Sequence, residues 1–337
     1  MNGDQAKWIL VGQGLAGTCL AWALWQRGVK FLVVDRGVGG SSRIAAGMVN
    51  PITGKNFEPS WRIEEFLPEA LGFYAWVEER LGQQIWRPFP VLRLAGSAKE
   101  WRKIVSKLEL AHVAPWVLGE VAVSQVWAGA VELRGGGWLD TRAFLDGSRA
   151  FFEALGCYQS GDFVTANQSQ QVIHCDGAAG LLAGHCGPSR CAKGEILSVR
   201  ASDWDETHIR IGAGGWLIPQ GQRIFKVGST YEWLELDEVP TAKARLRVEE
   251  IASRLGGEGF EVIHHQAGIR PILRRSEPLI GPLKEGAWMF NGLGSKGSLY
   301  APGMARRLVS WLLDGTEPEP EVDFRVYRDQ TRNHESG

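Results

Sequence analysis

The sequence predicts an α/β protein built around a parallel sheet, and three features near the N-terminus carry this prediction. A short apolar run, residues 8–11, leads directly into the glycine-rich stretch VGQGLAG at residues 11–17. Small and apolar residues follow as far as Gly28, which is placed to end a helix. A second apolar run, residues 31–35, ends at Asp35. Because short apolar runs on either side of a helix are typical of buried parallel strands, we expect a strand–helix–strand unit.

The three glycines of this stretch have the spacing of a dinucleotide-binding loop. Gly12 permits a tight turn, Gly14 lets the backbone approach a pyrophosphate, and Gly17 lets helix and strand pack closely. The helix N-terminus then faces the phosphates, and Asp35 is placed to accept hydrogen bonds from the ribose hydroxyls. We therefore predict a Rossmann-like domain. The loop itself does not separate NAD from FAD, because both cofactors carry the same adenosine diphosphate half.

Composition excludes several other classes of protein. The 337 residues include 37 Lys and Arg against 38 Asp and Glu, without a basic run, so we expect no nucleic acid partner. The five cysteines are odd in number and scattered, which favours reduced thiols and a cytoplasmic location. His185, Cys186 and Cys191 lie close together but lack a second ligand pair, so we expect no metal site. No apolar run of about 18 residues occurs, which predicts no membrane span.

The segment after Asp35, residues 37–57, has neither a helical nor a strand period. We interpret it as an extended loop close to a ligand, because its apolar residues are unusual for a surface loop. Within it, SSRIAAGMVNPITG resembles the segment that runs along the flavin in the D-amino-acid oxidase and glycine oxidase superfamily, and is especially similar to a bacterial branch of it. The resemblance implies FAD as the cofactor. No cysteine follows Cys191, so the C-terminal cysteine attachment of some sarcosine oxidases is excluded and FAD is expected to bind noncovalently.

The resemblance extends over most of the chain. Residues 136–157 resemble the helix that leads back into the nucleotide domain, and QVIHCDGAAG, residues 171–180, resembles the family's second approach to the pyrophosphate. Near the C-terminus, residues 288–315 read as a strand, a glycine loop and a helix from about residue 299 to residue 313. Such a helix can point its positive end at the N1 and O2 edge of the flavin.

We therefore expect a discontinuous FAD-binding domain made of residues 1–72, 134–190 and 265–337. The intervening residues, 73–133 and 191–264, combine amphipathic helix with alternating strands. They predict an α+β substrate domain whose antiparallel sheet lies over the flavin.

The expected cofactor-binding residues come from the two glycine loops, the segment after Asp35 and the strand end near residue 177. Among them, Ser41, Ser42 and Arg43 are placed to contact phosphates. The full set is Gly12, Gly14, Leu15, Ala16, Gly17, Asp35, Arg36, Ser41, Ser42, Arg43, Ala46, Gly47, Met48, Val49, Gly177, Gly292, Gly294, Ser295, Lys296 and Gly297.

Arg270 is the principal candidate for substrate binding. It lies in GIRP, which is similar to the family segment whose arginine grips the substrate carboxylate through a two-pronged hydrogen bond. The alternative is an ion pair with an acid of the sheet, such as Glu277. The neighbouring Arg274 and Arg275 depart from the better-known amino-acid oxidases and indicate either extra negative charge on the substrate or an exposed basic loop.

Three more residues are candidates for catalytic roles. Tyr231 is placed where its hydroxyl can enter the cavity or its ring can pack. His265 is a candidate base, although strand alternation sends it and His264 to opposite faces, so at most one of them faces the flavin. Lys296 is a candidate for stabilising reduced flavin or assisting oxygen, with a solvated loop lysine as the alternative.

The resemblance implies FAD-dependent oxidation of an amine carbon in a small amino acid or related carboxylate-bearing amine. Hydride passes to flavin N5 and the imine hydrolyses in water, with oxygen or an electron-transfer partner as the final acceptor. Two alternatives stay open at this point: a 2-hydroxy-acid dehydrogenase, which needs a base such as His265, and a flavin-binding protein without turnover. A third, modification of an amine on RNA as in related fused enzymes, is disfavoured by the near-neutral charge.

Overall fold

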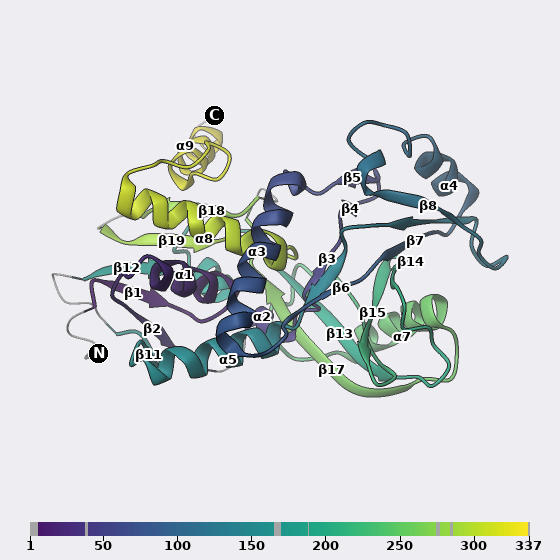
Figure 1. Ribbon diagram of the computed structural model, residues 1–337, viewed down its shortest axis with the longest axis horizontal. Helices are drawn as coiled ribbons and strands as arrows, with labels where there is room; N and C mark the ends of the chain where they lie inside the picture. The colour runs from purple at the N-terminus through teal and green to yellow at the C-terminus, as the bar shows by residue number, and fades with distance from the viewer. Residues whose placement is uncertain are drawn as a thin grey trace.

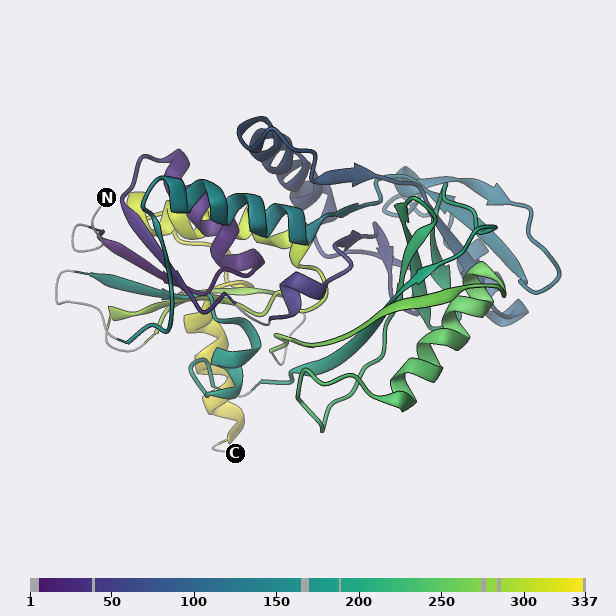
Figure 2. The ribbon, with the colours of Figure 1, turned by 90° about the horizontal axis from the view of Figure 1, so that it is seen from below.

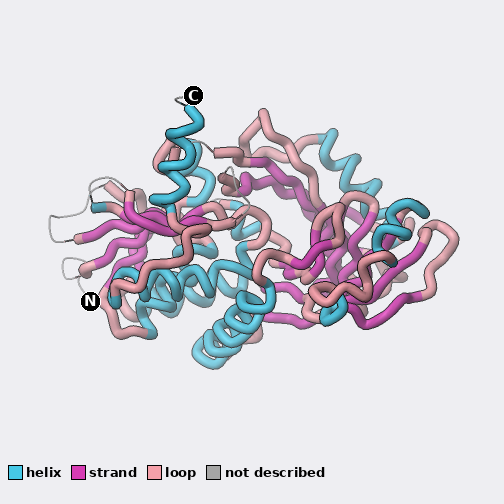
Figure 3. Tube along the Cα trace, turned by 90° about the horizontal axis from the view of Figure 1, so that it is seen from above, coloured by secondary structure: helices cyan, strands magenta, loops and turns pink. Residues whose placement is uncertain are grey.

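The computed structural model describes residues 6–37, 40–164, 170–187, 189–273, 277–283 and 286–335. Its strands gather into two large sheets that lie side by side along the molecule (Figures 1 and 3). The predicted α/β fold is confirmed. Within the described residues, no helix is both long enough and apolar enough to cross a lipid bilayer.

The first sheet has six strands and contains the predicted strand–helix–strand unit. Its order is β11 (Tyr158–Ser160), β2 (Phe31–Asp35), β1 (Trp8–Val11), β12 (Gln171–His174), β19 (Trp288–Asn291) and β18 (Leu279–Pro282). All neighbouring pairs are parallel except β18 with β19. Strands β1 and β2 are apolar and almost fully buried because the sheet is covered on both faces there.

Helices cover both faces of this sheet (Figure 2). On one face lie α1 (Leu15–Gln26), α3 (Ile63–Leu81), α5 (Thr141–Ala154) and α8 (Gly297–Asp314), and on the other lies α9 (Phe324–Glu335). Helix α1 is buried on nearly all sides because α5 and α8 pack against it, and its Trp22 Nε1 donates a hydrogen bond to Ser148 Oγ at 2.8 Å. The predicted C-terminal helix is present and is slightly longer than expected.

The second sheet has eight strands and lies at the other end of the molecule. Its order is β17 (Glu261–Arg270), β13 (Ala192–Arg200), β16 (Ile224–Gly228), β15 (Gly215–Gly221), β14 (Ile209–Gly212), β7 (Val91–Ala95), β9 (Gly129–Leu133) and β8 (Val117–Val121). It is antiparallel apart from the β14–β7 pair. Helices α4 (Ala98–Val105) and α7 (Ala242–Gly256) flank it (Figure 1).

Several short elements complete the fold. They are β3 (Met48–Val49), β10 (Gly137–Leu139) and β6 (Trp86–Pro88) in one small sheet, β4 (Ile52–Thr53) and β5 (Glu58–Pro59) in a hairpin, the helices α2 (Ser41–Ile44) and α6 (Gly177–Leu182), and a 3-10 turn, Ala114–Trp116. The interpretation of residues 37–57 as loop throughout was therefore wrong. Strand β3 forms there because β10 supplies its hydrogen-bond partner from a distant part of the sequence.

Two of the expected domain limits fall inside regular elements. The limit between residues 72 and 73 divides α3, and the limit between residues 264 and 265 divides β17, which pairs with β13 over its whole length. The sequence shows no break at either position. The amphipathic pattern of the helix continues across residues 72 and 73, and the alternating pattern of the strand continues across residues 264 and 265. The three-part division of the chain otherwise stays a prediction.

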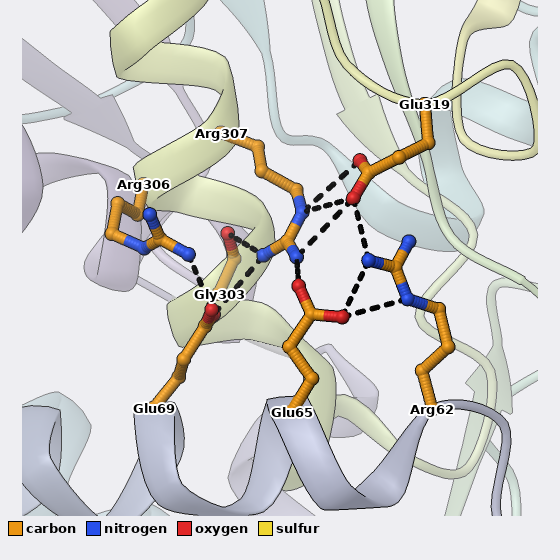
Figure 4. Close-up of polar contacts among 7 residues, drawn as sticks. All are labelled: Arg62, Glu65, Glu69, Gly303, Arg306, Arg307 and Glu319. Carbon is orange, nitrogen blue, oxygen red and sulfur yellow. Dashed lines mark hydrogen bonds and ion pairs between the residues drawn. The ribbon is translucent and has the colours of Figure 1, made fainter.

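An ionic cluster joins the start of α3 to α8 and to the loop after it (Figure 4). Arg62 and Arg307 both contact Glu319, at 2.7 and 3.2 Å, and Arg307 also pairs with Glu65 and Glu69. Partial burial alone would raise the pKa of Glu319. Hydrogen bonds from its own backbone amide and from the two arginines outweigh that effect and hold the pKa at about 2.

Replacing Glu319 with glutamine should lower the thermal midpoint near pH 7, because the two arginines lose a shared carboxylate. A carboxyl group with a depressed folded-state pKa stabilises the fold above its ordinary pKa of about 4.5, and that stabilisation is lost as the pH falls toward 2. The difference between wild type and Glu319→Gln, measured by thermal unfolding from pH 7 to pH 2.5, should therefore shrink below about pH 5. Glu321→Gln, an exposed change two residues away, is the control. An equal difference at every pH would contradict this assignment.

Candidate functional site

A cavity of about 1660 Å³ lies between the two large sheets and receives residues from both. On one side are the carboxyl ends of β1, β2 and β12, represented by Gly12, Asp35 and Asp176. On the other side are Ile196 and Arg270 of the eight-stranded sheet. Open α/β sheets bind their ligands at the carboxyl ends of the strands, so this cavity is the candidate site.

The first glycine loop has the geometry that the spacing predicts. Gly12 adopts φ +102°, and a Cβ atom there would lie 2.7 Å from the carbonyl oxygen of Cys175. A Cβ atom on Gly17 would lie 1.9 Å from the carbonyl oxygen of Gly12. A side chain at either position would collide with backbone, so the loop keeps its close approach to the ligand only with glycine. Gly14 has more room, since its nearest neighbour is Ser42 Oγ at 3.1 Å.

Asp35 is held at the end of β2 by two backbone amides. Gln13 N donates to Asp35 Oδ1 at 2.8 Å, and Gly37 N donates to Oδ2 at 2.7 Å. Gln13 is buried and its side chain donates to the carbonyl oxygen of Leu145 at 2.7 Å. Gln13 is a positioning residue that the sequence analysis missed, because the residue between the first two glycines carries no distinctive pattern.

The segment after β2 is fixed by contacts that the sequence does not predict. Gly47 adopts φ +69°, and a Cβ atom there would lie 1.9 Å from the carbonyl oxygen of Leu139. Lys226 Nζ donates to the carbonyl oxygen of Ala45 at 3.0 Å, and burial lowers the pKa of this lysine. Ile44 lies against Gly268 of β17. The segment therefore crosses from one large sheet to the other beneath the cavity.

Most of the expected cofactor residues line this cavity. Those that do are Gly12, Gly14, Leu15, Ala16, Asp35, Arg36, Ser41, Ser42, Arg43, Ala46, Gly47, Met48, Val49, Gly177, Gly294, Ser295, Lys296 and Gly297. Gly17 and Gly292 do not line the cavity. Gly17 serves the packing of α1, as the spacing predicts, and a Cβ atom on Gly292 would meet Leu273 Cδ1 at 2.7 Å. Asn50, which was not predicted, also lines the cavity, and its buried Oδ1 has no hydrogen-bond partner among the described residues.

The second glycine loop brings the start of α8 to the cavity. Lys296 precedes the helix, and its Nζ donates to Thr53 Oγ1 at 3.2 Å. Burial lowers the pKa of Lys296, and the nearby Glu277 carboxylate partly offsets that effect. The positive end of a long helix and a lysine therefore face the same part of the cavity, where they can stabilise negative charge.

Arg270 ends β17 inside the cavity. Its Nη2 donates to Ser229 Oγ at 2.8 Å and to the carbonyl oxygen of Thr230 at 3.1 Å, and its guanidinium lies 4.0 Å from the centre of the Tyr231 ring. Burial lowers the pKa of this guanidinium, and Tyr231 acts in the opposite direction. Within the described part of the chain, these contacts go to neutral oxygens and a ring, and no ion pair with Glu277 is formed. Arg274 and Arg275 lie outside the described residues.

Tyr231 and His265 occupy different environments. Tyr231 lines the cavity as a half-exposed ring stacked against Trp233. His265 does not line the cavity. Its Nε2 lies 2.8 Å from Oε2 of the buried Glu195, and Glu195 accepts hydrogen bonds from the backbone amide and hydroxyl of Thr241. His264 is exposed on the opposite face, as strand alternation predicts. The proposed role of His265 as a base therefore has no support from its position.

A cluster at the end of β12 was not predicted. His174 Nδ1 and His185 Nδ1 lie 3.2 and 2.9 Å from the same oxygen, Oδ2 of Asp176. These three donor atoms all lie within 4.8 Å of one another. His185 therefore faces Asp176 rather than forming the cysteine cluster considered from the sequence. The sequence contains one indication of this cluster, the run His-Cys-Asp at residues 174–176. His174 and Asp176 are two residues apart at a strand end and therefore lie on the same side of the chain.

Comparisons with known proteins agree with this geometry. A glycine oxidase from Pseudomonas putida is 32% identical over 135 residues, which is 39% of this chain and 37% of that protein. The tRNA 5-methylaminomethyl-2-thiouridine biosynthesis bifunctional protein MnmC from Methylibium petroleiphilum is 25% identical over an alignment covering 96% of this chain and 59% of that protein. The matches thus span between about a third and three fifths of these relatives.

Solved structures share the fold at lower identity. Glycine oxidase from Geobacillus kaustophilus superposes with a TM-score of 0.78 at 19% identity, covering 93% of this chain and 95% of that chain. Iminodiacetate oxidase from Chelativorans sp. BNC1 gives 0.75 at 18% identity, covering 92% and 96%. The DAO family, described as FAD dependent oxidoreductase, matches residues 7–311. The chain therefore belongs to the DAO family of FAD-dependent oxidoreductases, with FAD as its cofactor.

Proposed function

We propose that this oxidoreductase oxidises the carbon–nitrogen bond of a small amine that carries a carboxylate. The observation that carries the proposal is Arg270, whose guanidinium faces the cavity with only neutral partners in the described residues. Such a cation in a partly dehydrated site is suited to a two-pronged grip on a carboxylate. The glycine oxidases among the relatives support a substrate of this class.

Each polar residue near Arg270 then has a distinct task. Bound FAD supplies the hydride acceptor. Arg270 would hold the carboxylate and so orient the substrate carbon toward that acceptor, and the Tyr231 ring restricts the guanidinium to one direction. The start of α8 and Lys296 stabilise the negative charge that develops. A substrate bound as the neutral amine needs no side-chain base, and the imine product hydrolyses in water.

The position of His265 favours an amine over a 2-hydroxy acid. Oxidation of an alcohol needs a base for the hydroxyl proton, and His265 instead faces Glu195 outside the cavity. We also infer oxygen or an electron-transfer partner as the final acceptor, noncovalent FAD and a cytoplasmic location. Five free, buried cysteines support the last point. The near-neutral net charge gives no support to a nucleic acid partner.

The test is anaerobic bleaching of the flavin in the purified holoprotein. Matched pairs of amino acid, N-methyl amino acid and hydroxy acid, such as glycine, sarcosine and glycolate, are mixed with the protein without oxygen. Bleaching by amines and not by the matched hydroxy acids is expected. Bleaching by hydroxy acids alone would overturn the proposal, and no bleaching by any compound would indicate a flavin-binding protein without turnover. Readmission of oxygen or of an artificial electron acceptor then identifies the oxidant.

A further inference from the structure

Basic side chains collect at the end of the cavity that lies in the eight-stranded sheet. We call this group the basic rim, and it consists of Lys55, Arg93, Lys99, Lys103 and Arg254. They come from the turn between β4 and β5, from β7 and α4, and from the end of α7. Glu100 is the acidic residue among them, so the rim carries an excess of positive charge although the whole chain is almost neutral.

Most of these cations have no carboxylate to neutralise them. Arg93 Nη2 lies 3.1 Å from Glu100 Oε1. Lys103 Nζ instead donates to the neutral amide oxygen of Asn56 at 2.7 Å, and the Arg254 guanidinium lies 5.6 Å from the centre of the Trp127 ring. Among the described residues, Arg93 is the one member of the rim that forms an ion pair. These four side chains are exposed, so solvent screens their mutual repulsion, but together they offer one side of the cavity a positive potential for an anion.

The rim is connected to the flavin end of the cavity by a short stretch of chain. Thr53 accepts a hydrogen bond from Lys296 near the start of α8, and Asn56, in the same turn, holds Lys103. Arg270, Thr53 and the rim all line one cavity, so a ligand held by Arg270 has space to extend toward the rim.

We propose that the basic rim binds a phosphate group at the end of the amine substrate remote from the flavin. This inference rests on the proposed function and narrows its substrate class. A phosphate is favoured over a second carboxylate because a dianion offers three oxygens and two charges to several separate cations. Arginine and lysine side chains are the usual partners of such groups, and an inner arginine with outer lysines matches a phosphate that enters from the cavity mouth.

The test uses racemic α-amino acids that end in a phosphonate, with two, three or five methylene groups between the α-carbon and the phosphonate. Each is compared with the ω-carboxylate and the methyl-ended amino acid of the same length, by calorimetric binding to the holoprotein and by anaerobic flavin bleaching. We expect the phosphonate of the best length to bind at least tenfold more tightly than its methyl-ended analogue and to show a correspondingly lower KM. Its advantage should fall as salt is added.

The variant Lys99→Gln/Arg254→Gln should remove that advantage and leave kcat for the methyl-ended compound within about twofold. Arg102→Gln is the matched control, because Arg102 lies on the same helix, is exposed and does not line the cavity. Phosphonate binding unaffected by the rim variant, or weakened equally by Arg102→Gln, would overturn the inference. If the ω-carboxylates gained as much affinity over the methyl-ended compounds as the phosphonates do, the rim would be a general anion site, and the inference of a phosphate site would be overturned.

Two further outcomes separate this inference from the proposed function. Tight, rim-dependent binding of the phosphonates without bleaching by any amine would support the rim and reject amine oxidation. Bleaching by small amines without a phosphonate preference would support amine oxidation and reject phosphate binding by the rim. A short single-stranded RNA is added as a competitor, and if it displaced the flavin-reducing amine at lower concentration than any phosphonate, the small-molecule ligand would be rejected in favour of a nucleic acid phosphate.

Discussion

Replacing Arg270 with methionine should lower kcat/KM for a carboxylate-bearing amine by about a hundredfold or more. The side chain keeps its bulk and loses a charge-assisted, two-pronged hydrogen bond, which is worth about 3 kcal/mol in a partly dehydrated site, and each 1.4 kcal/mol corresponds to a factor of ten. Most of the loss should appear in KM if the arginine binds ground state and transition state equally. It should appear in kcat if the grip also sets the distance between the substrate carbon and the flavin.

Two further variants show whether the effect belongs to the carboxylate grip. Arg270→Lys keeps the charge without the planar fork and should retain roughly a tenth of wild-type kcat/KM. Arg190→Met removes an exposed arginine that contacts Trp233 but does not line the cavity, and it should leave kcat/KM unchanged. Steady-state kinetics with an amino acid and with a simple alkylamine complete the comparison. Arg270→Met should impair only the amino acid, and equal losses for both substrates would mean that Arg270 supports the fold rather than the substrate.

The parts of the fold that the sequence predicts are those determined by neighbouring residues. The unit β1–α1–β2 could be predicted because an apolar run, a glycine loop and an acid at a strand end follow one another within 28 residues, 8–35. The same logic predicts α8, whose glycine loop and apolar face are contiguous in the sequence. Arg270 was predicted from its short motif and does line the cavity.

The parts that could not be predicted depend on contacts between distant residues. Strand β3 is two residues long and exists because β10 pairs with it, so no local period marks it. His265 looks like a base in sequence because nothing nearby reveals that Glu195, on the adjacent strand, faces it. The basic rim could not be predicted from the sequence for the same reason. Its five cations come from three separate segments, and only the fold brings them to one wall of the cavity.

Replacing Gly17 with alanine should damage both the fold and the binding of FAD. The added methyl group would lie 1.9 Å from the carbonyl oxygen of Gly12 and 3.3 Å from Cys175 Cβ. Gly12 is held in place, because its amide donates a hydrogen bond to the carbonyl oxygen of Val34 at 2.9 Å. Overpacking usually costs about 1–3 kcal/mol, and a collision with the backbone of Gly12, with Cys175 Cβ close on the other side, belongs near the top of that range. We expect the thermal midpoint to fall by about 10 °C.

Two other glycine-to-alanine variants of the same region show how much of the lost stability is due to this collision and how much to replacing any glycine by alanine. Gly14→Ala should be milder, since its nearest neighbour is the Ser42 hydroxyl, a side-chain atom that can rotate away. Gly28→Ala meets no atom within 4 Å and should cost only the backbone penalty of φ +66°, about 1 kcal/mol. Flavin content is measured as the colour that acid releases per chain. It should fall in Gly17→Ala, where the loop is displaced, and in Gly14→Ala, where the methyl group is added at the backbone that approaches the pyrophosphate, and least in Gly28→Ala. Equal flavin content in all three would show that the loop tolerates a side chain, and the close approach would then not govern cofactor binding.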